Sequence, residues 1–196
     1  MAQSLRARAV GGAEVQQVLL TARGDEPGGA VRGISVEVQL TSARVLACRY
    51  ILEGDLTRLR VPELHAGERR DGLWQHTCFE VFIAAAGASG YYELNFSPSR
   101  DWAAYHFEGY RTGMSAVTLQ RPPELGVQRR GERLELTAAV SLAGLGPLQD
   151  GRLLRLALAA VTEGADGRLT YWALQHAPGK PDFHHPHGFA LELRAA

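Results

Sequence analysis

The stretch Gly33–Thr41, with the sequence GISVEVQLT, carries the signal that decides the fold class. Apolar and polar residues alternate along it, the apolar set being Ile34, Val36, Val38 and Leu40. A period of two is typical of a β-strand with one face in a core and the other in water. A second strand-like run, Arg44–Leu52 (RVLACRYIL), follows after the two-residue link Ser42-Ala43. These two runs predict an antiparallel β-hairpin.

Ten further stretches have strand-like composition and end in turns rich in Gly, Asp and Pro. We expect strands at Val18–Ala22, Leu56–Val61, Cys78–Ala84, Tyr91–Ser97, Trp102–Tyr110, Gly126–Arg130, Arg133–Val140, Leu153–Thr162, Thr170–Leu174 and Gly188–Leu193. Leu142–Leu148 is expected to form one short helical turn. Arg152–Ala160 also fits a helix because Leu and Ala dominate it, but its alternation favours a strand.

Short strands that recur about every 8 to 15 residues, with no long helical pattern between them, are typical of a sandwich. The sequence therefore predicts an all-β, antiparallel β-sandwich of Greek-key or jelly-roll type. We find no internal repeat, linker or low-complexity tract. We expect a single domain over residues 1–196, with residues 1–15 loosely ordered.

Charge and composition exclude several classes of protein. The 21 basic and 21 acidic residues balance, so no net field favours nucleic acid or an anionic membrane as a partner. No apolar run reaches the length of a signal peptide or a membrane span, so the default expectation is a soluble, cytoplasmic protein. Cys48 and Cys78 lie in apolar, strand-like settings and are expected to be reduced core thiols.

Two windows, residues 74–114 and 171–189, hold all three Trp and six of the seven His. They also hold Asn95, the only Asn, and Lys180, the only Lys, which are residue types that cores seldom take. Alternation places Glu80 on the same strand face as two apolar neighbours, which is costly unless the carboxylate meets a donor or a cation. Glu93 and Asn95 share a face of the next strand. Two such rows on adjacent strands predict a concave polar patch.

The motifs in these windows resemble a known family. Leu-Trp-Gln at 73–75, Cys-Phe-Glu-Val-Phe-Ile at 78–83, Tyr-Tyr-Glu-Leu-Asn-Phe-Ser-Pro at 91–98 and Lys-Pro-Asp-Phe-His at 180–184 look like the DOMON-like domains related to family-nine carbohydrate-binding modules. More narrowly, the chain is similar to bacterial DOMON-like proteins of uncharacterised role. The resemblance covers roughly residues 33–193. It implies a β-sandwich that binds sugars or, in some branches, haem.

The resemblance also implies residue roles. The sugar-binding relatives hold a sugar between two tryptophans, with a Glu shortly after the first, and Trp74 and Glu80 match that spacing. Trp172 is the expected second wall. The relatives' calcium-binding acidic clusters are absent here, and Asn95 stands where the relatives place an Arg.

We therefore expect a non-catalytic binding module for a carbohydrate or related polyol, a small-molecule ligand. A pyranose presents C–H faces that stack on indole and hydroxyls that need acceptors and donors. The candidate ligand-binding residues are Trp74, Glu80, Glu93, Asn95, Arg111, Trp172, His176, Lys180, Asp182 and His184. No residue is assigned as catalytic or metal-binding, and no cofactor is assigned.

Three alternatives stay open. Haem could be held by Met114 with one of His76, His106, His176 or His184, and a transition metal by the histidines of the second window. Glu80 and Glu93 could form the acid/base pair of a glycosidase, whose separation would set the stereochemistry. The polar residues could also serve a structural or interaction domain, by tying its loops down.

Overall fold

The computed structural model describes residues 8–10, 13–23 and 29–195, and within them the chain forms thirteen strands. Their bounds are β1 (Arg8–Val10), β2 (Ala13–Arg23), β3 (Val31–Leu40), β4 (Val45–Gly54), β5 (Cys78–Ala85), β6 (Tyr91–Phe96), β7 (Trp102–Phe107), β8 (Ser115–Ala116), β9 (Glu124–Arg130), β10 (Arg133–Ser141), β11 (Leu154–Glu163), β12 (Leu169–Ala173) and β13 (Leu191–Leu193). Short 3-10 helices lie at Leu56–Arg58 (η1), Leu73–Gln75 (η2), Gly146–Gln149 (η3) and Pro186–Gly188 (η4). The fold is all-β, as predicted. The terminal segment expected to be loosely ordered lies largely outside the described residues.

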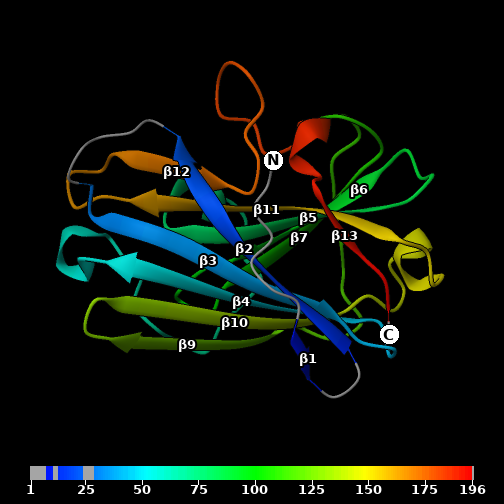
Figure 1. The fold of residues 1–196 in the computed structure, drawn as a ribbon, viewed down its shortest axis with the longest axis horizontal. Coiled ribbons are helices and arrows are strands. Elements are labelled where there is room, and N and C mark those ends of the chain that lie inside the picture. The colour runs from blue at the N-terminus through cyan, green and yellow to red at the C-terminus, as the bar shows by residue number, and fades with distance from the viewer. Residues whose placement is uncertain (1–7, 11–12, 24–28, 196) are drawn as a thin grey trace.

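The strands form one curled antiparallel sheet in the order β8-β7-β6-β5-β11-β12-β2-β3-β4-β10-β9. Its two halves pack as the layers of a sandwich, and β2 passes from one layer to the other (Figure 1). The first part of β2, from Gln16 to Leu20, pairs with β3, and Thr21 to Arg23 pair with β12. The antiparallel β-sandwich expected from the sequence is therefore confirmed.

The main core lies between the two layers and consists of the apolar rows that alternation predicts. Ile34, Val36, Val38 and Leu40 are all 2 % exposed or less. From the other layer Phe79, Val81 and Ile83 face them, each fully buried. The hairpin is confirmed, because β3 and β4 pair in antiparallel register from Leu40 and Leu46 outward.

The structure of β11 explains why the composition of Arg152–Ala160 also fits a helix. It is paired with β5 on one side and with β12 and β13 on the other, and nine of its ten residues are buried. A central strand that is covered on both faces reads as a continuous apolar run rather than as an alternation. The prediction of a strand here is confirmed.

Some expected boundaries are wrong. Leu56–Val61 is not a strand: η1 begins there because Asp55 accepts a 3.0 Å hydrogen bond from the Thr57 amide and caps the turn. Of this stretch only Leu59 makes a bridge, to Gly164. The helical turn expected at Leu142–Leu148 is displaced to η3. Cys48 and Cys78 are buried and unbridged, as expected.

A second apolar cluster covers the outer face of the layer made by β5, β6, β7 and β11. Its members include Phe82, Tyr91, Tyr105, Phe107 and Phe189, and the C-terminal segment 174–190 lies against them. Much of this face is therefore covered rather than solvated. No helix in the described parts of the chain is long and apolar enough to cross a membrane.

Candidate functional site

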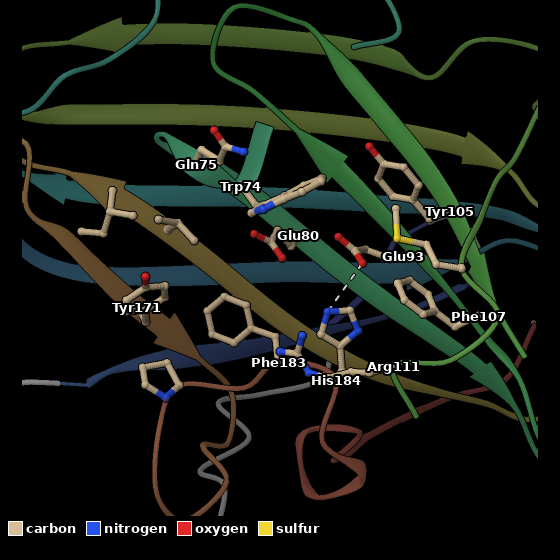
Figure 2. A pocket seen from close by; sticks show the side chains of 14 residues that line it. Trp74, Gln75, Glu80, Glu93, Tyr105, Phe107, Arg111, Tyr171, Phe183 and His184 are labelled. Atoms are coloured by element: carbon tan, nitrogen blue, oxygen red, sulfur yellow. Dashed lines mark ion pairs between the residues drawn. The ribbon is translucent and has the colours of Figure 1, made fainter. Parts of the chain in front are cut away.

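A pocket of about 570 Å³ opens on the outer face of the layer that contains β5, β6 and β7. Its lining comes from strands, from η2 and from two loops, and includes five Trp, Tyr or Phe rings and two carboxylates (Figure 2). The lining residues are Trp74, Gln75, Glu80, Glu93, Tyr105, Phe107, Arg111, Met114, Val161, Leu169, Tyr171, Pro181, Phe183 and His184.

Strand register brings the two carboxylates to one face. Glu80 on β5 pairs with Asn95 on β6, and Glu93 pairs with Phe82 on one side and Tyr105 on the other. Residues that pair directly across antiparallel strands point to the same side of a sheet. Glu80 and Glu93 are therefore diagonal neighbours, and Figure 2 shows both at the centre of the pocket.

Glu80 is the most unusual group of the site. It is only 2 % exposed, and its Oε1 accepts no hydrogen bond from any described residue. Burial raises its pKa well above the usual range, and the negative charge of Glu93 raises it further. The Glu80 carboxyl therefore favours its neutral form more strongly than a free glutamate does.

Glu93 is 5 % exposed, and its Oε1 accepts a 2.8 Å hydrogen bond from Asn95 Nδ2. Burial raises the pKa of Glu93 to about 7, although the Asn95 hydrogen bond and the Arg111 charge act in the opposite direction. Glu93 thus changes its charge near neutral pH. Asn95 itself is fully buried, and its Oδ1 has no partner among the described residues.

His184 forms the wall next to Glu93. Its Nδ1 lies 2.9 Å from the Tyr91 hydroxyl, and its Nε2 lies 3.9 Å from Glu93 Oε2. Burial lowers the pKa of His184 to about 4, and the Arg111 charge acts in the same direction. The imidazole is therefore neutral near pH 7 and does not compensate the charge of Glu93.

Aromatic side chains line the pocket from two sides. Trp74, on η2, is 38 % exposed and packs edge-on against Tyr105 with ring centroids 5.9 Å apart. The Tyr105 hydroxyl donates a 2.6 Å hydrogen bond to Asp71, which fixes that ring. Tyr171 and Phe183 pack edge-on at 6.0 Å on the other side. An exposed indole beside fixed rings is a surface on which an apolar ligand face can stack.

Asp182 ties two loops together at the pocket rim. Its carboxylate accepts hydrogen bonds of 2.9 and 3.1 Å from the Arg111 guanidinium, and one from the Tyr110 hydroxyl. It also accepts a 3.1 Å bond from the backbone N–H of His184. These bonds connect the 108–114 loop to the C-terminal segment and hold Arg111 at the pocket edge.

Of the ten candidate residues, five line the pocket together: Trp74, Glu80, Glu93, Arg111 and His184. Asn95 lies beneath it and reaches it through Glu93, and Asp182 reaches it through Arg111. His176 and Lys180 do not line it. His176 Nε2 lies 2.8 Å from the backbone oxygen of Thr21, so this ring ties the C-terminal segment to β2, and Lys180 is exposed in the following loop.

The structure corrects the expectation that Trp172 forms the second aromatic wall of the site. It lies in the main core, 7 % exposed, and its Nε1 donates a 3.2 Å hydrogen bond to Thr162 Oγ1. Trp172 pairs with Ala160, on the core face of β11, whereas its neighbour Tyr171 pairs with Val161 on the outer face. The wall is therefore formed by Tyr171. The period of two along β12 places the two rings on opposite faces, but it does not say which ring meets the core.

Sequence reasoning also missed Tyr105, Phe107 and Phe183 as lining residues. Tyr105 and Phe107 sit on alternate positions of β7, so their shared face is visible in the sequence. Phe183 has no such signal, because it lies in a loop that packs on the sheet across a long sequence separation.

The described residues include no group of three or more His, Cys, Asp or Glu side chains placed to hold a metal ion. Met114 and His184, two of the expected haem ligands, line the same pocket. However, Nδ1 of His184 is engaged by Tyr91 and its Nε2 faces Glu93. A haem iron bound at Nε2 would have to fit beside the Glu93 carboxylate, whose Oε2 lies 3.9 Å from that nitrogen.

The sequence and the structure were compared with known proteins. No protein-family model matches the sequence, and no curated protein matches it. The chain is similar in structure to a crystal structure from Bacteroides uniformis ATCC 8492 described as a "putative carbohydrate-binding protein". The TM-score is 0.68 at 15% sequence identity, over 94% of this chain and 87% of the other. The two proteins share this β-sandwich fold.

Proposed function

We propose that this chain is a non-catalytic binding module whose pocket takes a carbohydrate or related polyol. The observation that carries the proposal is the meeting of Trp74, an exposed indole, with buried polar groups in one concave site. A sugar ring has an apolar C–H face and a polar edge, so it needs both kinds of surface. The DOMON-like resemblance and the description of the structural neighbour support the same ligand class.

The polar groups suit hydroxyls. A neutral Glu80 carboxyl can donate one hydrogen bond and accept others, whereas an ionised Glu93 only accepts. Arg111, held at the rim by Asp182, supplies N–H donors. This mixture of donors and acceptors matches a polyol, in which every hydroxyl both donates and accepts.

The test is titration calorimetry with neutral monosaccharides, disaccharides and polyols, after a sugar array has selected the candidates. Trp74→Ala should weaken binding of a selected sugar about tenfold, the equivalent of about 1.4 kcal/mol. Leu19→Ala is the matched control, because Leu19 is also exposed but does not line the pocket. Binding that survives Trp74→Ala unchanged would refute stacking on this indole.

A second candidate function, glycoside hydrolysis, is favoured by one observation. Glu80 and Glu93 line the same pocket, and the pKa of each is raised, which is the property required of a general acid. Release of chromophore from aryl glycosides would support it, provided that Glu80→Gln and Glu93→Gln both abolish the release. If the protein binds sugars but releases no chromophore, glycoside hydrolysis is refuted and the function as a binding module is supported.

A further inference from the structure

The pocket holds two acidic side chains and no cation free to neutralise them among the described residues that line it. Arg111 is the one Arg or Lys of the lining, and its guanidinium is already bound to Asp182 at 2.9 and 3.1 Å. His184 carries no charge near neutral pH, as described above. Glu80 and Glu93 therefore face the cavity without a dedicated counter-charge.

Glu80 is also a polar group left unsatisfied. The residue is 98 % buried, it lines the cavity, and its Oε1 has no hydrogen-bond partner among the described residues. An orphaned buried carboxyl oxygen is costly, and such groups in native proteins call for an explanation. A ligand donor placed above Glu80 would supply the missing bond.

The surrounding rings indicate the charge of that donor. Trp74 and Tyr105 lie on one side of the two carboxylates, and Tyr171 and Phe183 lie on another (Figure 2). The π-faces of Trp and Tyr attract cations, and the attraction grows when the cation is removed from water. Carboxylates enclosed by aromatic rings therefore form a site suited to an ammonium group.

We propose that the pocket recognises an amino sugar, whose protonated amine is bound by Glu80 and Glu93 while its ring stacks on Trp74. The inference rests on the proposed carbohydrate-binding function and specifies the ligand class. An ammonium group donates three hydrogen bonds, enough for the Glu80 carboxyl and a Glu93 oxygen together. A neutral sugar offers only hydroxyls and brings no positive charge to the two carboxyls.

Binding of an amino sugar should also release protons, which can be measured. Burial raises the pKa of both carboxyls, so they hold their protons to higher pH than free carboxyls do, whereas an ammonium ion stabilises their ionised forms. Each carboxyl that ionises on binding releases its proton to the solvent, and the charge of the amine is unchanged. A neutral sugar has no reason to displace these protons.

The experiment compares glucosamine, N-acetylglucosamine and glucose by titration calorimetry at about pH 6.5, where the amine is protonated. Glucosamine should bind at least about tenfold more tightly than glucose, which corresponds to about 1.4 kcal/mol. N-acetylglucosamine, in which the charge is removed, should show no such gain. Repeating the titrations in buffers of different ionisation enthalpy should reveal proton release with glucosamine alone.

Glu80→Gln and Glu93→Gln keep the side-chain shape and remove the charge. In each variant, glucosamine affinity should come close to the glucose affinity of that same variant. Glu63→Gln, at an exposed position outside the pocket, is the matched control and should keep the preference. Use of two separate variants keeps the test valid if one of them does not fold.

The outcomes are distinguishable. Equal binding of glucose and glucosamine would overturn the amine site and leave the carbohydrate function in place. A preference that persists in both Gln variants would overturn the assignment to these carboxylates. Failure of every sugar and polyol to bind would overturn the proposed function and the amino-sugar inference together.

Discussion

Asn95 Nδ2 donates a 2.8 Å hydrogen bond to Glu93 Oε1 from a position that is fully buried beneath the pocket. Of the influences that lower the pKa of Glu93, this bond is the largest, ahead of the charge of Arg111. Asn95 thus acts on the charge of the pocket without lining it. It is a positioning residue for the carboxylate.

Asn95→Leu should therefore raise the pKa of Glu93 above its present value of about 7. Leu has the same number and branching of side-chain heavy atoms, so the change removes the donor without opening a cavity. Carboxyl NMR titration of Glu93 in the two proteins measures the shift. An unchanged or lower pKa in the variant would contradict the role given to this hydrogen bond.

The second prediction concerns stability and pH. The pKa of Glu93 is raised from 4.5 to about 7 on folding, so between these values the folded chain binds more protons than the unfolded chain. The free energy of unfolding must then fall as pH rises through this window, by about 3 kcal/mol for the full shift. The stabilisation is fully present below pH 4.5 and is lost as pH rises through about 7.

Glu93→Gln cannot titrate at this position, so it should lack this part of the fall, whereas Glu80, whose pKa burial also raises, is present in both proteins. His184 has its pKa lowered to about 4 and acts in the opposite direction, but it is present in both proteins and its effect cancels in the comparison. Urea unfolding at several pH values gives the difference between the two. The variant should gain stability relative to the parent as pH rises from 4.5 to about 7. A pH-independent difference would argue against a buried, protonated Glu93.

Trp172 gives the third prediction, because its environment differs from that of Trp74. Trp172→Phe removes buried volume and the hydrogen bond to Thr162 from the main core, so it should lower the free energy of unfolding by about 1 to 3 kcal/mol. Sugar affinity of the folded variant should stay within about twofold. Unfolding by denaturant and calorimetric titration measure the two quantities. A large loss of affinity with unchanged stability would place Trp172 in the site after all.

The difference between Trp172 and Tyr171 shows which features of the site can be predicted from the sequence. Alternation located the strands and the row on β5 and β6 that carries Glu80, Glu93 and Asn95, because one face of each strand is apolar. On β12 both faces are aromatic, so composition alone does not say which side meets the core. A shift of one residue in a strand moves a side chain to the opposite face of the sheet.

Other features depend on tertiary contacts that have no local signal. Tyr91 and His184 are 93 residues apart in sequence and lie in hydrogen-bond distance. The sequence predicts a strand over Leu56–Val61, but the Asp55 cap closes a 3-10 turn at its start. Such outcomes follow from capping chemistry and from loop packing, whereas periodicity reports only burial.

Asp182 provides the last prediction. Its carboxylate joins Tyr110, Arg111 and the His184 backbone, and hydrogen bonding to these groups holds its pKa below the usual range although burial opposes this. Asp182→Ala breaks all these bonds at once and frees the 108–114 loop from the C-terminal segment. We expect faster amide hydrogen exchange over residues 108–114 and 181–185, with little change in the β3–β4 hairpin.

Ligand affinity should fall in the same variant, because ordering two loosened loops costs conformational entropy on binding. Asp166→Ala is the matched control, since Asp166 is an exposed turn carboxylate that accepts a backbone hydrogen bond from Arg168 and lies outside the pocket. It should change neither the exchange at the pocket rim nor the affinity. If Asp182→Ala left both quantities at their parental values, the rim would be held by packing of Phe183 and its neighbours rather than by this carboxylate.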